Sequence, residues 1–199
     1  MTAPAYFVND TRRTDYAWSD WDEVAAFIRD QAVCRIAVND GTWPYVVAQV
    51  FHFKDGAFLV HCSRSGRLAA ALQRDPNCTI EIDQIVSLLK APRAENTSAE
   101  YRSVVARCTA TLALHDLDIE TQQYETLDEK YRPEKDYLPI DTERATRRIL
   151  AIRAQIVSLS AKKRILDEGG NPAGLPYLRF AFPPPAALSQ LPPEAFEHR

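Results

Sequence analysis

The sequence lacks the short motifs that mark the common nucleotide-binding and hydrolytic enzymes. None of its 199 residues form a G-x-G-x-x-G, P-loop, G-x-S-x-G or H-E-x-x-H pattern. The net charge is only −3, so the charge balance does not indicate bulk nucleic-acid or membrane binding. A local phosphate site is still compatible with this composition, because such a site needs only a few donors.

Targeting and metal-binding signals are absent as well. Residues 1–18 carry several charged side chains and no apolar core, unlike a secretory signal. No apolar run approaches the ~20 residues that span a bilayer. The cysteines form no C-x-x-C pair and are too widely spaced for a typical zinc site, so we expect free, buried thiols and no metal: Cys34, Cys62, Cys78, Cys108. We expect a cytoplasmic protein without nucleic-acid or membrane partners.

The residues that are present predict one domain, residues 20–165, between an N-terminal arm, 1–19, and a Pro-rich tail, 166–199. Ser19 begins a helix-capping signal, and apolar residues follow it at helical spacing, which predicts a helix at about 20–31. Turn signals at Asp40-Gly41 and Asp55-Gly56 separate β-rich runs and favour an antiparallel meander. The expected strands are 33–38, 44–53, 57–61, 78–88, 101–115 and 149–160. Further helices are expected from Ser65, at 118–131 and at 141–148. The pattern predicts an α+β fold, a six-stranded, mainly antiparallel barrel with flanking helices.

The best candidate for a binding site is the segment from His61 to Leu68, which joins a predicted strand to a predicted helix. It contains two hydroxyls, one glycine and two guanidinium groups. A helix N-terminus adds unpaired backbone N–H groups and the positive end of a dipole. These are the components of a phosphate site. The alternative is that Ser65 only caps the helix and that the arginines are solvated.

Several segments, in order, resemble the FMN-binding split barrel. A Pro-led strand, P-Y-V-V-A-Q-V-F, lies between two D-G turns, and a strand ending in His61 leads into an S-x-x-G-R stretch that opens a helix. The segments Y-R-S-V-V at 101–105 and I-V-S-L-S-A-K-K at 156–163 resemble later parts of the same pattern. The order and spacing make residues 20–165 similar to the pyridoxamine-phosphate-oxidase-like and nitroimidazole-reductase-like families.

The resemblance implies a split β-barrel homodimer that binds FMN between its protomers. It implies an oxidoreductase acting on a small molecule, with NADH or NADPH as electron donor. His61 is the candidate catalytic residue, because imidazole can donate and accept hydrogen bonds near neutral pH. The resemblance places backbone along the isoalloxazine ring at Val47, Ala48 and Gln49. It lines the ribityl chain and ring edge with His61, Cys62 and Ser63. It assigns the phosphate to Gly66 and Arg67, with further contacts from Ser103 and Lys163.

One departure from the family pattern affects the phosphate. The family usually has two consecutive basic residues where this chain has Arg67-Leu68. The missing charge-assisted contact is worth roughly 1.5–3 kcal/mol, unless Arg64 replaces it. A Leu68→Lys change is expected to restore the second charge.

Two other functions are consistent with the same barrel. The first is a non-catalytic flavin- or haem-binding protein with His61 or His52 as the axial ligand. The second is a barrel that has lost its cofactor and acts as an interaction module. The arginine run Arg144, Arg147, Arg148 and Arg153 is expected to be solvated. Ion pairs with Glu125, Asp128 and Glu129 are an alternative that would contribute little.

Overall fold

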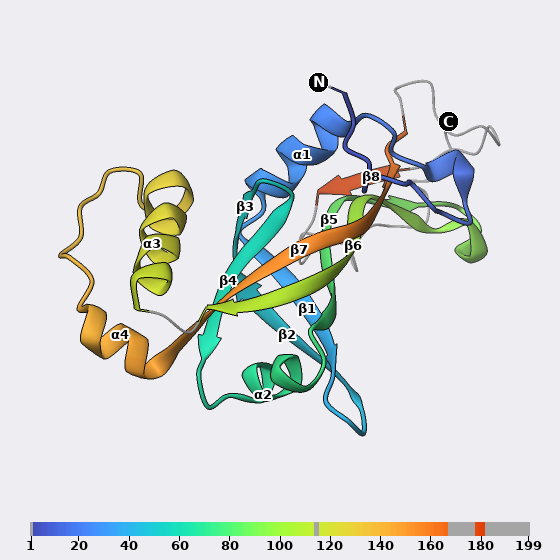
Figure 1. Ribbon diagram of the computed structural model, residues 1–199. Coiled ribbons are helices and arrows are strands. Elements are labelled where there is room, and N and C mark those ends of the chain that lie inside the picture. The colour runs from blue at the N-terminus through green and yellow to red at the C-terminus, as the bar shows by residue number, and fades with distance from the viewer. Residues whose placement is uncertain (1, 114–115, 167–177, 182–199) are drawn as a thin grey trace. The chain divides into compact units, whose positions relative to one another are not determined.

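The computed structural model describes residues 2–113, 116–166 and 178–181 (Figure 1). Two compact units are present, and each combines segments that are distant in the sequence. The first comprises Met1–Asp10, Ser19–Ile82 and Val104–Ser160, and the second comprises Thr11–Trp18, Asp83–Ser103 and Ala161–Arg199. No helix in the described part of the chain is long and apolar enough to cross a membrane.

The described residues form eight strands and four α-helices. The strands are β1 (Val33–Asn39), β2 (Pro44–Val50), β3 (His52–Lys54), β4 (Ala57–Ser63), β5 (Asn77–Lys90), β6 (Ser98–Ala113), β7 (Ile149–Arg164) and β8 (Leu178–Ala181). The helices are α1 (Trp21–Asp30), α2 (Arg67–Arg74), α3 (Asp116–Thr126) and α4 (Thr142–Arg148), and a π-helical turn (Leu127–Tyr131) continues α3. Short 3-10 turns lie at Thr14–Tyr16 and Ala94–Asn96.

The strand order in the sheet is β2-β1-β5-β6-β7-β4-β3, and β8 pairs with β5 off this path. The pairs β1–β2, β1–β5, β3–β4, β4–β7 and β5–β8 are antiparallel. The predicted α+β class and antiparallel sheet are therefore confirmed, with a different strand count. Two short strands account for the difference from six.

The first extra strand arises at Phe51, where the predicted strand 44–53 divides into β2 and β3. The hydroxyl of Tyr131 accepts a hydrogen bond from the Phe51 N–H at 3.0 Å and lies 2.9 Å from the Phe51 carbonyl, to which it donates. These contacts replace strand partners at this position. A side chain 80 residues away in the sequence therefore interrupts the strand, which no local pattern indicates.

The second extra strand, β8, lies in the predicted tail and belongs to the second unit. Glu100 is buried there and accepts hydrogen bonds from the Ser87 hydroxyl at 2.6 Å and the Leu166 N–H at 2.8 Å. Arg179 of β8 pairs with the same carboxylate at 3.0 Å. A buried carboxylate needs such partners to offset the loss of hydration. The rest of the predicted tail, 167–177 and 182–199, lies outside the described residues.

The core of the first unit is built on α1 and on aromatic side chains of β3 and β4. Asp20, rather than Ser19, caps α1 and accepts from the Glu23 N–H at 3.1 Å. The ring centroids of Phe58 lie 5.6 Å from Phe51 and 5.3 Å from Phe53. Each such fully buried side chain contributes roughly 1.5–3 kcal/mol.

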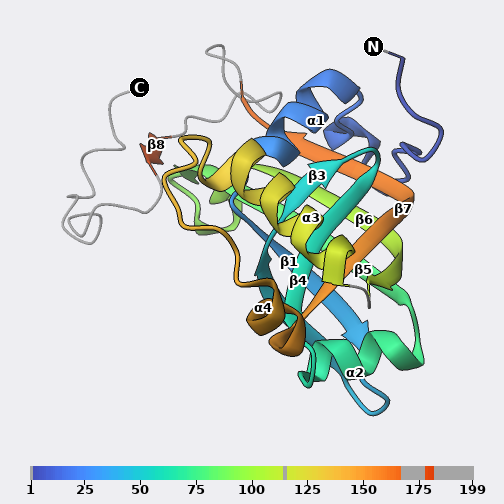
Figure 2. The same cartoon turned by 60° about the vertical axis from the view of Figure 1, so that its left-hand side comes forward.

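The segment from α3 to α4 is attached to the sheet by polar contacts, and α3 runs alongside β3 and β4 (Figure 2). The Gln122 amide donates to the Val60 carbonyl at 2.8 Å. Lys54 pairs with Glu125 at 3.1 Å and with Glu129 at 3.0 Å. Glu129 also contacts His52 at 3.0 Å. Glu125 of α3 and Glu129 of the π-helical turn thus pair with β3 and not with the arginines.

Candidate functional site

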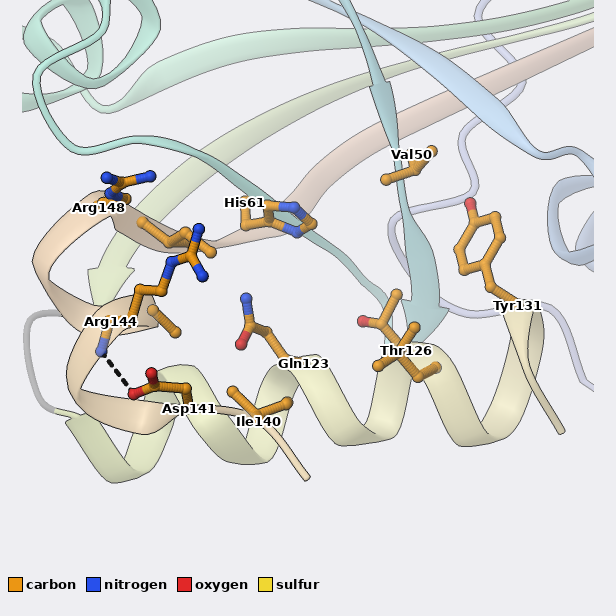
Figure 3. A pocket seen from close by; sticks show the side chains of 12 residues that line it. Val50, His61, Gln123, Thr126, Tyr131, Ile140, Asp141, Arg144 and Arg148 are labelled. Carbon is orange, nitrogen blue, oxygen red and sulfur yellow. Dashed lines mark hydrogen bonds between the residues drawn. The ribbon is translucent and has the colours of Figure 1, made fainter. Parts of the chain in front are cut away.

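Two adjoining hollows lie within the first unit, where β4 meets α4. The first is a cavity of about 500 Å³ between α3, α4 and β4, which we call the His61 cavity (Figure 3). The second is a cleft of about 680 Å³ at the β4–α2 turn, which we call the arginine cleft. Both are lined by His61, Arg148 and Ile149, so a ligand in one hollow lies next to the other.

The His61 cavity has a predominantly apolar wall with few polar groups. Its apolar lining consists of Val50, Leu127, Ile140, Ala145 and Ile149. His61 from β4 and Gln123 from α3 point into the same space (Figure 3). The Oε1 atom of Gln123 is buried and has no hydrogen-bond partner within the described part of the chain. A ligand or a bound water with an N–H or O–H group satisfies such an acceptor, because an unmade buried hydrogen bond costs about 1–3 kcal/mol.

His61 and His52 lie in different environments, although both are on strands of the same sheet edge. Burial lowers the pKa of His61, so its half-buried imidazole is neutral near pH 7. Burial also lowers the pKa of His52, but that ring is bound to Glu129 and is only 8% exposed. His61 is therefore the histidine that is open to a ligand.

The arginine cleft contains the components of an anion site. The hydroxyls of Ser63 and Ser65 lie 3.5 Å apart, and Arg64, Arg147 and Arg148 line the same space. No carboxylate is among the described residues that line it. Arg147 contacts Glu143 on its own helix at 3.2 Å, an exposed pair that contributes little.

Backbone contacts hold the turn that forms the floor of this cleft. The Gly66 N–H donates to the Ser63 carbonyl at 2.9 Å, and the Arg64 N–H donates to the Arg148 carbonyl at 2.9 Å. A Cβ atom on Gly66 would lie 3.1 Å from the Ser63 carbonyl oxygen, so a larger residue would open the turn. Gly66 rather than Ser65 is the N-cap of α2, and no side chain caps this helix. The hydroxyl of Ser65 is thus available to a ligand.

Arg67 contacts another part of the chain. Its Nε donates to Asp40 Oδ2 at 2.7 Å, and its guanidinium carbon lies 4.5 Å from the ring centroid of Tyr45. Arg67 is not among the residues that line the arginine cleft. Leu68 is 3% exposed and packs into the core.

The other predicted site residues divide between the two units. Gln49 on β2 and Cys62 on β4 line the arginine cleft, and burial raises the pKa of Cys62. Val47 is half-buried and Ala48 is exposed on β2, the terminal strand in the sheet order. Ser103 and Lys163 belong to the second unit, where the Lys163 ammonium lies 5.4 Å from the centroid of the Trp18 ring.

Comparison with known proteins assigns the chain to a family. The family model described as pyridoxamine 5'-phosphate oxidase matches residues 20–163. The chain belongs to this family. The predicted resemblance to pyridoxamine 5'-phosphate oxidase-like proteins is therefore confirmed. No curated protein matches the sequence significantly.

Solved structures confirm the split-barrel fold of this pyridoxamine 5'-phosphate oxidase family member. The flavocytochrome Anf3 from Azotobacter vinelandii is 19% identical, with a TM-score of 0.72 over 92% of this chain and 90% of that chain. A FAD- and haem-binding protein from Mycobacterium smegmatis is 16% identical, with a TM-score of 0.66 over 90% and 95%. A putative 5-nitroimidazole antibiotic resistance protein from Bacteroides thetaiotaomicron is 18% identical, with a TM-score of 0.62 over 73% and 85%. At these identities the similarity shows the fold alone.

The structure adds residues that sequence reasoning missed. Arg147 and Arg148 line the arginine cleft, whereas Arg144 and Gln123 line the His61 cavity. The arginine run was visible in the sequence, but its spacing is also that of an ordinary solvated helix face. The structure shows that the acidic residues of 125–129 have other partners: Glu125 and Glu129 pair with Lys54 of β3, and Asp128 pairs with Lys135.

Proposed function

We propose that this member of the pyridoxamine 5'-phosphate oxidase family binds FMN in the arginine cleft and acts as an oxidoreductase on a small molecule. The donor set of the cleft carries the proposal. Two serines and three arginines line a space whose described lining has no carboxylate. A phosphate monoester carries a charge of about −1.5 to −2 at pH 7 and accepts such charge-assisted hydrogen bonds.

The placement of the phosphate follows from this donor set. Ser63, Ser65 and the close turn at Gly66 provide a hollow lined by polar groups, and Arg64 of the β4–α2 turn and Arg148 of α4 line it as well. Arg64 thus supplies the positive charge that the family's second basic residue provides, where this chain has Leu68. Asp40 competes with a phosphate for Arg67, so the predicted contact from Arg67 needs that ion pair to open.

The strands next to the cleft suit a flavin ring. A bound flavin supplies electron-transfer chemistry, while the protein supplies binding, orientation and electrostatics. The backbone of Val47, Ala48 and Gln49 borders the ring, since β2 is the terminal strand in the sheet order and presents polar groups along its outer edge. His61, held neutral by burial, orients the substrate or the ring edge by donating or accepting a hydrogen bond.

The quaternary proposal is a cytoplasmic homodimer with NADH or NADPH as the electron donor. Trp43 in the β1–β2 turn is 71% exposed, and Val46 on β2 is 56% exposed. Exposed apolar side chains that lie together support a protein interface. A second protomer against β2 would bury them. Ser103 and Lys163 remain predicted contacts of the complete site.

Flavin binding is tested by spectroscopy and titration. The purified protein is expected to show a flavin spectrum, or to quench FMN fluorescence on reconstitution, and light scattering should give the mass of a dimer. FMN should bind at least tenfold more tightly than riboflavin, because the phosphate contacts are worth more than about 1.4 kcal/mol. Equal affinities for FMN and riboflavin would show that the phosphate does not bind in the arginine cleft. An absence of binding to either flavin would refute the proposed cofactor.

A second candidate function is haem binding in the His61 cavity. The observation that favours it is a neutral imidazole facing an apolar space of about 500 Å³, with Arg144 and Arg148 on the lining. A haem offers an apolar macrocycle, an iron that histidine ligates and two carboxylates that pair with guanidinium groups. The two relatives named for a cytochrome or haem cover at least 90% of this chain, against 73% for the nitroimidazole resistance protein.

The two histidines provide the test of this candidate. Reconstitution with haemin should produce a Soret band in the wild type and in His52→Ala. His61→Ala should lose the band or bind haemin with a shifted spectrum. An unchanged band in His61→Ala would exclude His61 as the ligand, and a loss in His52→Ala alone would assign the iron to the other histidine.

A further inference from the structure

Two thiols lie opposite each other on the neighbouring strands β5 and β6. The Ala110 N–H donates to the Pro76 carbonyl at 2.8 Å, and the two strands are adjacent in the sheet. The connection between the two strands, residues 91–97, is too short for a parallel crossover, so the strands run antiparallel. In an antiparallel pair with Ala110 opposite Pro76, Cys108 lies opposite Cys78. In such a hydrogen-bonded pair the Cα atoms are about 5.5 Å apart. A disulfide spans about 4.4–6.8 Å between Cα atoms.

The two side chains share one environment. Cys78 is 7% exposed and Cys108 is 2% exposed, and both are free thiols. The interaction with the neighbouring Cys108 thiol lowers the pKa of Cys78, although burial acts in the opposite direction. The same contact, with burial, raises the pKa of Cys108. Cys78 is therefore the better nucleophile, since the thiolate is the reactive form.

A small oxidant has access to this pair. Both sulfur-bearing residues line a cavity of about 790 Å³, together with polar residues of the β1–β2 turn and Arg107 of β6. This cavity is separate from the arginine cleft and the His61 cavity, and no described residue is common to its lining and theirs. The inference therefore does not depend on a bound cofactor.

We propose that Cys78 and Cys108 form a reversible disulfide when the protein meets a hydroperoxide. The Cys78 thiolate attacks a peroxide oxygen, so that an S–O bond forms, the O–O bond breaks and, with hydrogen peroxide, the leaving hydroxide takes a proton to become water. The Cys108 sulfur then attacks the Cys78 sulfenic acid, an S–S bond forms, and a second water leaves with the Cys108 proton. Two thiols are oxidised and one hydrogen peroxide is reduced to two waters. The product cross-links β5 to β6 at the wall of the cavity.

The other cysteines provide internal controls. Cys34 is fully buried, and burial raises its pKa to about 12. Burial also raises the pKa of Cys62 on β4. Cys34 lies on β1 and Cys62 on β4, so neither is the cross-strand partner of Cys78 or Cys108. Both are expected to stay reduced at peroxide concentrations that oxidise the pair.

The experiment treats the full chain with hydrogen peroxide and reads the intact mass and the non-reduced peptide map. The expected result is a loss of two hydrogen atoms and a linked peptide containing Cys78 and Cys108, both reversed by dithiothreitol. Cys34→Ser and Cys62→Ser should retain the link, whereas Cys78→Ser should abolish it. Cys108→Ser should instead leave a sulfenic acid on Cys78 that dimedone labels. A wild-type map without the link, or with a link to Cys34 or Cys62, overturns the proposal even if a variant fails to fold.

Discussion

Arg67 at the first turn of α2 and Asp40 in the β1–β2 turn form an ion pair, with Arg67 Nε 2.7 Å from Asp40 Oδ2. The carboxylate also accepts from the N–H groups of Trp43, at 3.0 Å, and Thr42, at 3.2 Å. These backbone donors, with Arg67, lower the pKa of Asp40 to about 2, so the pair is charged throughout the physiological range. Arg67 thus holds the turn next to β2 as well as being a predicted phosphate contact.

This ion pair makes the arginines separable by mutation. Arg148→Ala should weaken FMN binding by about tenfold or more, the effect of one charge-assisted contact of roughly 1.5–3 kcal/mol. Arg67→Ala should weaken it less, because Asp40 already occupies that guanidinium. Riboflavin, which has no phosphate, should bind both variants and the wild type equally. Fluorescence quenching measures all of these affinities, and a larger loss in Arg67→Ala than in Arg148→Ala would place the phosphate beside α2 instead.

Leu68 does not occupy the place of a second phosphate-binding residue. Its side chain is 3% exposed, so Leu68→Lys would put an uncompensated ammonium into the core. We expect a loss of about 3 kcal/mol or more in the free energy of unfolding, and no gain in FMN affinity. Urea unfolding measures the loss, with Leu68→Met as the control that should cost less than about 1.5 kcal/mol. A stable Leu68→Lys protein that binds FMN more tightly would show that a basic residue at position 68 reaches the phosphate, as the family pattern predicts.

Lys130 should make stability depend on alkaline pH. Its buried Nζ lies 3.6 Å from the centroid of the Phe51 ring and has no hydrogen-bond partner within the described residues. Burial lowers its pKa from 10.5 to about 8. Between pH 8 and pH 10.5 the unfolded chain holds more protons at this position than the folded chain does. The free energy of unfolding therefore rises as the pH rises through this range, and it falls as the pH returns to about 8.

Urea unfolding of wild type and Lys130→Met between pH 7 and pH 10.5 tests this prediction. The variant removes the titrating group and keeps an apolar side chain over Phe51. It should unfold at higher urea concentration than wild type at pH 7, and the difference should shrink towards pH 10.5. A constant difference at every pH would show that Lys130 titrates in the folded protein as it does in the unfolded chain.

The hydroxyl group of Tyr131 should make its own contribution to stability. The hydroxyl lies 2.6 Å from the Ala32 carbonyl and 2.9 Å from the Phe51 carbonyl, and it accepts from the Phe51 N–H at 3.0 Å. Tyr131→Phe leaves these backbone groups without their partner and should cost about 1–3 kcal/mol. The control is Tyr137→Phe, whose hydroxyl contacts the side chain of Asp128, and this change should cost less. Equal losses would show that the Phe51 backbone is satisfied by another route.

The turns and the repeating patterns were accessible from the sequence because they depend on neighbouring residues. Asp55 and Gly56 adopt φ values of 50° and 68° in the β3–β4 turn, a conformation that Asp-Gly favours and that the sequence therefore predicts. Apolar residues at helical or alternating spacing similarly predicted α1 and most strands, and the order of these segments identified the family.

The site depended on contacts between residues that are far apart in the chain. Arg67 was predicted to bind phosphate, and yet Asp40 is 27 residues away and pairs with it. The segment that carries Gln123 and Leu127 into the His61 cavity also pairs with β3, through Glu125 and Glu129, which are 71 and 77 residues from their partners in the sequence. Local periodicity determines whether a residue faces the core or the solvent. It does not determine which partner a long charged side chain finds, because that choice depends on which strands the folded sheet brings together.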